Sequence, residues 1–173
     1  PGDQLIINAK LLKFKLNTCK IYSEIYVNEN LVAHSTFLAS IVKREEWFIN
    51  IHASSIVSSK AKIGKNVEIG PFCIIEDNVC ISNDTIIYSH VVVKEGTMIG
   101  EKCKIFSGTV LGEIPQDLKY HNEKTQLVIG DNNIIREYCT LHKGTADRGI
   151  TQLGNDCLLM AYVHVAHDSK INN

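Results

Sequence analysis

Aliphatic side chains recur at every sixth residue through most of the chain, and this period constrains the fold more than any other feature. The frame runs without a break from Ile51 to Leu111, resumes from Ile129 to Leu141, and returns from Leu153 to Ile171. A period of six fits neither an α-helix nor an alternating strand. It is typical of a hexapeptide β-helix, in which each step is a short strand followed by a turn.

Three such steps are expected to make one coil of a three-sided prism. The aliphatic residue of each step points inward and stacks on its counterpart in the next coil, about 4.8 Å away. Four places later, the inside of the turn accepts a small or β-branched residue: Ala61, Val67, Cys73, Val79, Thr85, Val91, Thr97, Cys103 and Thr109. A β-rich domain with chance periodicity is the alternative, and it leaves so regular a frame unexplained.

The cysteines follow the same frame rather than a disulfide or zinc pattern. Cys73, Cys103, Cys139 and Cys157 all occupy the small inward position, and their spacing matches no zinc motif. We expect small core residues in a reducing compartment, and hence a cytoplasmic protein. A net charge of −1 and the lack of a long apolar run predict neither nucleic-acid binding nor a membrane span.

Both ends of the chain look cut. The first residue is Pro1 rather than Met, there is no signal peptide, and Ile171 opens a new step just before the end. We therefore expect a fragment of a longer protein, with a β-helix truncated at its C-terminus.

Residues 1–47 obey a period of two instead of six. Three β-prone runs, residues 5–16, 19–27 and 31–42, are separated by polar turn residues and predict an antiparallel three-stranded meander. Three strands alone bury a poor core. After them, residues 43–46 are expected to form a solvated junction, and Trp47 and Phe48 to cap the first coil.

Two segments of this meander carry a resemblance: Pro1-Gly2-Asp3-Gln4-Leu5 and Leu31-Val32-Ala33-His34-Ser35-Thr36. With the strands between them, they resemble the C-terminal third of the hotdog-fold 3-hydroxyacyl-[acyl-carrier-protein] dehydratases. The catalytic His and Glu of that family precede the matching segment, so no residue here corresponds to them. The resemblance implies a dehydratase remnant without dehydration chemistry.

Two segments interrupt the six-residue frame. The first, from Glu113 to Val128, is polar and contains Pro115, and the second runs from Gly144 to Gln152. A solenoid accommodates an insertion as a loop that leaves its surface, and such loops often mark the functional face.

Three histidines cluster after the first loop: His142, His164 and His167. None takes the inward aliphatic slot, so we expect all three to project outward. If the six residues after Thr145 loop out, His142 and His167 stand on the same face, one coil apart.

Zinc binding and base catalysis both fit such a cluster. A zinc site needs three or four converging ligands. A general base needs one neutral imidazole, whose ordinary pKa of about 6.5 lets it take a proton from a hydroxyl near neutral pH. Asp168 is a candidate to fix the tautomer of His167, unless strand alternation turns its side chain away.

The interruptions and the histidines also carry a second, closer resemblance. The segments concerned are Gly112-Glu113-Ile114-Pro115-Gln116-Asp117-Leu118-Lys119-Tyr120, Ile129-Gly130-Asp131-Asn132-Asn133-Ile134-Ile135-Arg136-Glu137, His142-Lys143-Gly144-Thr145 and Leu158-Leu159-Met160-Ala161-Tyr162-Val163-His164-Val165-Ala166-His167-Asp168. From about residue 48 onward, the chain resembles the acyl-[acyl-carrier-protein]–UDP-N-acetylglucosamine O-acyltransferases, which catalyse the first step of lipid A synthesis. The predicted fold class is all-β: a short antiparallel meander followed by a left-handed parallel β-helix.

The resemblance implies a role for each matching residue. His167 matches the base that deprotonates the sugar 3-hydroxyl for attack on the acyl thioester, and Asp168 matches its partner. The acyl donor is the phosphopantetheine thioester of acyl-carrier protein, and neither a bound cofactor nor a metal is implied. The substrate-binding matches are His142 and His164 in the sugar-nucleotide and acyl site, Gln116 and Asp117 at the glucosamine, and Lys119 on the acyl path.

The resemblance also implies a homotrimer and an incomplete enzyme. The predicted domains are residues 1–47, the dehydratase strands with the junction, and residues 48–173, an incomplete acyltransferase domain. The family continues for further coils and a helical domain that carry oxyanion and uridine contacts, so the chain alone is expected to be inactive. A non-catalytic β-helical structural or binding module is the alternative.

Overall fold

The structure is a computed structural model that describes residues 4–15, 18–40 and 50–173. Its contacts divide the chain into two compact units, residues 1–46 and 47–173. The described residues form strands and turns but no helix, so no helix long and apolar enough to cross a membrane occurs among them. The predictions made for residues 1–3, 43–46, Trp47 and Phe48 fall outside these ranges.

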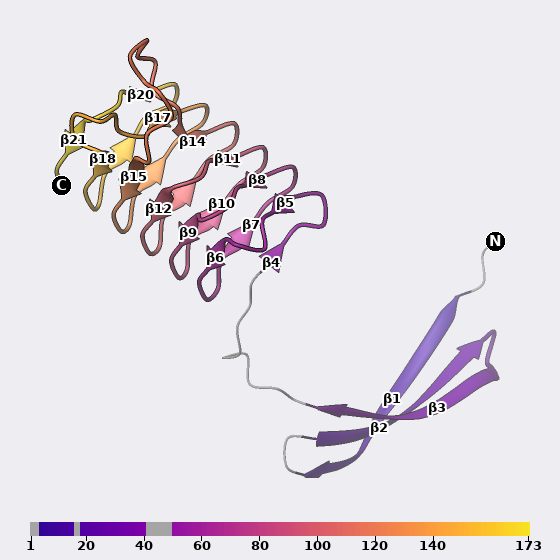
Figure 1. The fold of residues 1–173 in the computed structure, drawn as a ribbon. Helices are drawn as coiled ribbons and strands as arrows, with labels where there is room; N and C mark the ends of the chain where they lie inside the picture. Colours follow the sequence, from indigo (N-terminus) through magenta and orange to yellow (C-terminus); the bar gives the residue numbers. More distant parts are fainter. Residues whose placement is uncertain (1–3, 16–17, 41–49) are drawn as a thin grey trace. The chain divides into compact units, whose positions relative to one another are not determined.

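The first unit is an antiparallel sheet of three strands, in the order β1-β2-β3: β1 (Leu5–Lys15), β2 (Thr18–Val27) and β3 (Asn30–Ser40). Asn28 and Glu29, between β2 and β3, both have positive φ, 48° and 65°. Positive φ at both central residues is typical of the type I′ turn, one of the two common two-residue hairpin turns. The predicted meander is therefore confirmed over the described residues (Figure 1).

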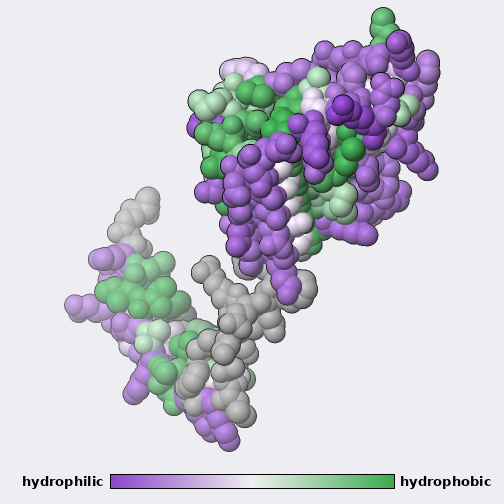
Figure 2. Space-filling model, turned by 90° about the vertical axis from the view of Figure 1, so that its left-hand side faces the viewer, coloured by the Kyte–Doolittle hydropathy of each residue, from purple (hydrophilic) through white to green (hydrophobic). Residues whose placement is uncertain are grey.

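One face of this sheet is apolar. Leu11, Ile21 and Phe37 lie opposite one another in register across the three strands, as do Ile7, Ile25 and Ala33. Cys19 is the only buried hydrophobic residue among the described residues of this unit, and green patches remain at its surface in Figure 2. A single layer of three strands covers neither of its faces.

The second unit winds through three parallel sheets of six strands, and successive strands fall on successive sheets (Figure 1). We call them the first, second and third sheets. The first holds β4 (Asn50–Ile51), β7 (Glu68–Ile69), β10 (Ile86–Ile87), β13 (Lys104–Ile105), β16 (Ile134–Ile135) and β19 (Leu158–Leu159). The second holds β5 (Ile56–Val57), β8 (Ile74–Ile75), β11 (Val92–Val93), β14 (Val110–Glu113), β17 (Thr140–His142) and β20 (His164–Val165). The third holds β6 (Lys62–Ile63), β9 (Cys80–Ile81), β12 (Thr97–Ile99), β15 (Gln126–Ile129), β18 (Ile150–Leu153) and β21 (Lys170–Ile171).

Each coil thus takes one strand from each sheet, as the six-residue period predicts. The fold class is confirmed: a three-stranded antiparallel meander precedes a left-handed parallel β-helix, and the described chain is all-β.

The frame aliphatics form the core of this β-helix. Ile69, Ile87 and Ile105 stack in register on the first sheet and are 2%, 1% and 0% exposed. The expectation that every frame residue is buried is wrong at the first coil, where Ile51 is 38% exposed. Ile51 pairs with Ile69 on one side, and no described strand lies on its other side.

The corners of the prism need a left-handed backbone. In most turns the third residue after the frame aliphatic has positive φ, as at Asn66, Asn78 and Asp84. Asn and Asp tolerate this region better than most side chains do. Asp168 occupies the same position of its turn, with φ of 58°.

Both interruptions of the frame leave the same corner of the prism, one after β14 and one after β17, and they are adjacent because these two strands pair. Both are shorter than predicted. Gln126 to Val128 belongs to β15 and Ile150 to Gln152 belongs to β18, and these two strands pair in register. The sequence hides this because each insertion adds a whole number of six-residue steps: Ile129 follows Leu111 by 18 residues, and Leu153 follows Leu141 by 12.

The adjacent residues Ile134 and Ile135 provide a matched test of the core. Ile135 is fully buried and Ile134 is 37% exposed on the outer face. Ile135→Asp should destabilise the β-helix by on the order of 3–5 kcal/mol, because it buries a charge without a partner. Ile134→Asp should change stability little. Urea unfolding followed by circular dichroism measures both, and equal losses would contradict this account of the core.

Candidate active site

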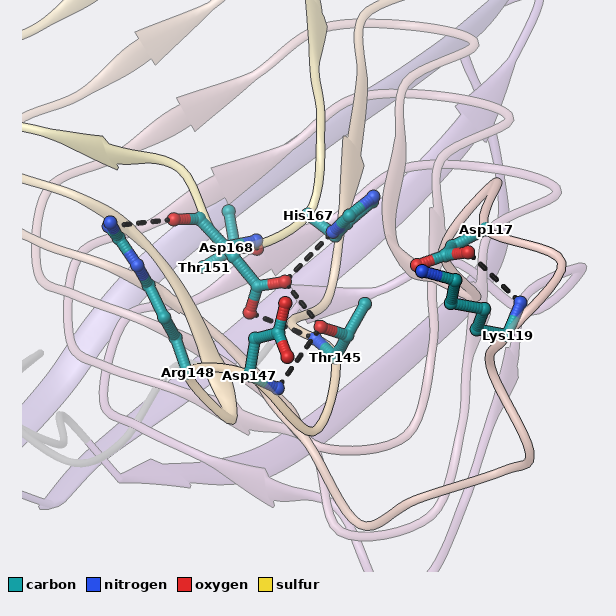
Figure 3. A network of polar contacts seen from close by, with 8 residues as sticks. All are labelled: Asp117, Lys119, Thr145, Asp147, Arg148, Thr151, His167 and Asp168. Atoms are coloured by element: carbon teal, nitrogen blue, oxygen red, sulfur yellow. Dashed lines mark hydrogen bonds and ion pairs between the residues drawn. The ribbon is translucent and has the colours of Figure 1, made fainter.

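His167 and Asp168 form a hydrogen-bonded pair in the turn that follows β20. The distance from His167 Nδ1 to Asp168 Oδ2 is 2.8 Å. Strand alternation does not separate these neighbours, because they lie in a turn and Asp168 has a φ of 58°. The left-handed backbone brings the carboxylate back toward the imidazole ring (Figure 3).

This contact defines the chemistry available to His167. The ionised carboxylate accepts a hydrogen bond, so Nδ1 carries the ring proton and Nε2 keeps a free lone pair. The side chain of His167 is 32% exposed, and its far ring nitrogen points away from Asp168 in Figure 3. The ring can therefore accept a proton at Nε2, while the carboxylate stabilises the imidazolium that results.

Two threonines hold Asp168 in place. Thr145 donates its backbone N–H to Oδ1, at 3.0 Å, and its hydroxyl to Oδ2, at 2.6 Å. Thr151 accepts the Asp168 backbone N–H at 2.8 Å, and Arg148 donates to the Asp168 carbonyl oxygen at 3.2 Å. Burial raises the pKa of Asp168, but hydrogen bonds from Thr145 and His167 outweigh burial and lower that pKa below its usual value.

The sequence did not single out Thr145, Arg148 or Thr151. Thr145 and Thr151 both stand at small inward positions of the six-residue frame, which predicted only packing for them. The sequence signal that could have identified them is the second interruption itself, because an insertion near candidate catalytic histidines often carries functional residues.

His142 lies inside the molecule, and the expectation that it projects outward is wrong. It ends β17 beside Glu113 of β14 and is only 4% exposed. The His164 ring packs edge-on against it, with the ring centroids 4.7 Å apart. Burial lowers the pKa of His142, the nearby rings of His164 and His167 lower it further, and Glu113 opposes them in part. His142 Nδ1 is buried without a hydrogen-bond partner.

His164 is exposed on the outer face of β20, where its Nδ1 lies 2.8 Å from the Thr140 hydroxyl oxygen. Leu141 and Val165 pair in register, as the predicted one-coil spacing requires. The structure therefore brings the three histidines and Asp168 together at the looped corner.

The loop residues Gln116, Asp117 and Lys119 lie apart from this cluster. Gln116 and Lys119 are exposed, and Asp117 uses its side chain to accept the Lys119 backbone N–H at 2.9 Å. Within the described part of the chain, no hydrogen bond or ion pair joins these three side chains to the histidines, and Figure 3 draws Asp117 and Lys119 as a separate pair. The described residues also contain no group of three or more His, Cys, Asp or Glu side chains placed to hold a metal ion.

Fold and site together define a hexapeptide-repeat β-helix with a histidine–aspartate pair at a looped corner. No protein-family model matches the chain. Two curated relatives match it over 124 residues, which is 71% of this chain and 46% of each relative. They are enzymes of Sulfurihydrogenibium sp., 54% identical, and of Cupriavidus metallidurans, 53% identical. Each is named acyl-[acyl-carrier-protein]–UDP-N-acetylglucosamine O-acyltransferase.

Solved structures give the same match. A UDP-N-acetylglucosamine acyltransferase from Bacteroides fragilis is 47% identical with a TM-score of 0.70, over 71% of this chain and 48% of that one. An enzyme from Acinetobacter baumannii is 46% identical with a TM-score of 0.70, and the matched shares are again 71% and 48%. The chain thus spans about half the length of the relatives that it matches.

The lowered pKa of His142 predicts how stability depends on pH. In the unfolded chain a histidine takes up a proton below about pH 6.5. In the folded chain His142 stays neutral to lower pH, so the native state loses stability as the pH falls from about 6.5 toward the folded pKa. His142→Gln removes this loss. Urea unfolding at pH 7 and pH 5 should show a smaller fall for the variant, and an identical fall in both proteins would contradict the burial of His142.

Proposed function

We propose that the protein transfers a 3-hydroxyacyl or other acyl group from acyl-carrier protein to the 3-hydroxyl of UDP-N-acetylglucosamine, the first step of lipid A synthesis. The observation that carries this proposal is the His167–Asp168 pair, joined by a hydrogen bond of 2.8 Å. The chain that holds this pair is 54% and 53% identical, over 124 residues, to two acyl-[acyl-carrier-protein]–UDP-N-acetylglucosamine O-acyltransferases. Because the chain spans under half of those enzymes, the activity is proposed for the complete gene product.

His167 acts as the general base in this mechanism. Its Nε2 takes the proton of the sugar 3-hydroxyl while the hydroxyl oxygen attacks the thioester carbonyl carbon. The tetrahedral intermediate then expels the phosphopantetheine thiolate, which takes the proton back from the imidazolium. Asp168 keeps the ring proton on Nδ1 and stabilises the imidazolium between the two transfers. A thioester is already an activated acyl donor, so a base and oxyanion stabilisation are sufficient for transfer.

The remaining site residues are proposed to bind substrate. His142 is proposed to line the sugar-nucleotide and acyl site, where the exposed His164 lies directly against its ring. Gln116 and Asp117 are proposed to bind the glucosamine, and Lys119 to lie along the acyl and phosphopantetheine path. These three side chains reach a bound ligand only if the loop and a neighbouring molecule enclose it.

A homotrimer would supply that enclosure. The outward residues of the second sheet are apolar from Ile56 through Ile74 to Val92, and the row continues to Thr140 and His164. Ile56 and Ile74 are 69% and 40% exposed. The outer faces of the first and third sheets instead mix apolar residues, such as Ile134 and Met98, with charged ones: Glu68, Lys104, Lys62 and Lys170. The apolar row is suited to packing against a second copy, which would cover His164 and complete the site.

We also propose a cytoplasmic location and a separate origin for residues 1–47. All six thiols are free, which fits a reducing compartment. Leu11, Ile21 and Phe37 share an apolar face of the sheet. In a hotdog-fold dehydratase a helix would cover such a face. This supports a dehydratase remnant without dehydration chemistry.

His167→Ala tests the proposed reaction. In the complete gene product it should lower kcat by about 10²–10⁴, the usual range for loss of a general base, while KM changes little. His142→Ala and Lys119→Ala should raise KM more than they lower kcat. The measurement is the rate at which acylated acyl-carrier protein and UDP-N-acetylglucosamine give the sugar ester and free acyl-carrier protein. Wild-type protein that forms no ester would favour a non-catalytic module, and near-normal turnover of His167→Ala would refute its role as the base.

Light scattering of the complete gene product tests the assembly. We expect three copies in the particle, held by the apolar row of the second sheet. Ile74→Lys should dissociate it and abolish transfer, because a lysine then lies in the interface. Met98→Lys is the matched control, since Met98 is 42% exposed on the outer face of the third sheet. A wild-type monomer that transfers acyl groups would contradict the proposal.

A further inference from the structure

The second interruption of the frame, between β17 and β18, has no part in the function proposed so far. It is held close to the prism. The Gly144 N–H donates to the Gln126 carbonyl oxygen at 3.2 Å, and the Gln126 N–H donates to the Gly149 carbonyl oxygen at 3.0 Å. A Cβ on Gly144 would lie 2.3 Å from the backbone nitrogen of Ile150, so the backbone approaches itself more closely than a side chain permits. This segment presents Thr145, which is only 6% exposed, to the active-site pair.

The hydrogen bonds of Thr145 determine where its hydroxyl proton lies. The hydroxyl oxygen is 3.3 Å from the backbone nitrogen of Asp147, an N–H that can only donate. The same oxygen lies 2.6 Å from Asp168 Oδ2, a carboxylate oxygen that accepts. The single hydroxyl proton is therefore directed to Asp168. Figure 3 marks both contacts with dashed lines.

The contact matters because Asp168 Oδ2 is also the oxygen that faces His167. It accepts from the Thr145 hydroxyl and from His167 Nδ1, while Oδ1 accepts the Thr145 backbone N–H. Thr145 thus touches both oxygens of the carboxylate and prevents its rotation about the bond to Cβ. Thr151 fixes the backbone of the same residue by accepting the Asp168 N–H.

From this geometry we infer that Thr145 is a positioning residue. It orients the Asp168 carboxylate so that His167 is held as the Nδ1–H tautomer, with Nε2 unprotonated and turned toward the substrate. The inference deepens the proposed function and rests on it for its catalytic meaning. It also gives the second interruption a role, because this segment holds the backbone N–H and the hydroxyl of Thr145 against the Asp168 carboxylate.

Nitrogen NMR of the purified protein tests the positioning without any substrate. The two ring nitrogens of a neutral histidine differ widely in ¹⁵N shift according to which one carries the proton. With ¹⁵N-labelled histidine, and with His167→Gln to assign the signals, wild-type His167 should appear as the Nδ1–H tautomer. Thr145→Val should give a mixture of tautomers, and Thr145→Ser should restore the wild-type spectrum.

Thr85→Val is the matched control for loss of a buried hydroxyl. Thr85 is fully buried, donates its hydroxyl to the Gly100 carbonyl oxygen at 2.8 Å and accepts the Cys103 N–H at 3.1 Å, in a coil remote from His167. This variant should leave the His167 tautomer unchanged. Thr145→Ala provides a smaller replacement should Thr145→Val fail to fold. An Nδ1–H signal that persists unchanged in folded Thr145→Val or folded Thr145→Ala would overturn the inference.

Kinetics of the complete gene product give the second readout. Thr145→Val should lower kcat by about 10- to 100-fold with KM nearly unchanged, the effect of losing a hydrogen bond to a charged group. Thr145→Ser should recover most of the rate. In a His167→Ala background Thr145→Val should not lower kcat further, because Thr145 acts on the reaction only through His167. Additive losses, or a raised KM alone, would show a structural role instead.

The two experiments separate failure of the inference from failure of the proposed function. If wild-type protein transfers no acyl group but the tautomer follows Thr145, then the positioning is right and the reaction is wrong. If wild-type protein is active and Thr145→Val changes neither tautomer nor kcat, then the reaction stands and the positioning is wrong.

Discussion

The stacking of inward aliphatic side chains, one coil above another at a spacing of about 4.8 Å, is the constraint on which the β-helix depends. Residues such as Ile87 and Ile105 pair in register with almost no exposure, so no coil can gain or lose a residue without breaking a column. Extra sequence is tolerated only where it leaves a corner. Both interruptions leave one corner, between the second and third sheets, and this places them beside each other.

The candidate site lies at that corner, where the regular coils hold the histidines and Asp168 in a defined geometry. Functional groups are positioned most accurately when rigid elements carry them and a supporting layer holds them. His164 stands on a strand, and His167 and Asp168 occupy a turn whose left-handed residue every coil requires. Thr145, beside the second interruption, then fixes the Asp168 carboxylate through its backbone N–H and its hydroxyl. The candidate site thus lies where the chain departs from the regular repeat.

The sequence predicted the repeat well because each six-residue step places one aliphatic side chain in the core, so the packing determines the period. It also predicted the one-coil spacing of Leu141 and Val165, and it named Asp168 as a candidate partner of His167, with which it makes a 2.8 Å contact. It misplaced His142, because a residue next to an inward aliphatic is expected outside, whereas pairing of β17 with β14 encloses it. Thr145 was missed because its small side chain already satisfied the packing rule.

The central claim is that the free nitrogen of His167 receives the proton of the sugar 3-hydroxyl, with Asp168 on the opposite side of the ring. A crystal structure of the complete gene product with UDP-N-acetylglucosamine bound tests this most directly. We predict that His167 Nε2 lies about 2.6–3.2 Å from the oxygen on C3 of the glucosamine, while the 2.8 Å contact of Nδ1 with Asp168 is kept. A sugar bound with that oxygen out of hydrogen-bonding reach, and with no water bridging it to Nε2, would contradict the account.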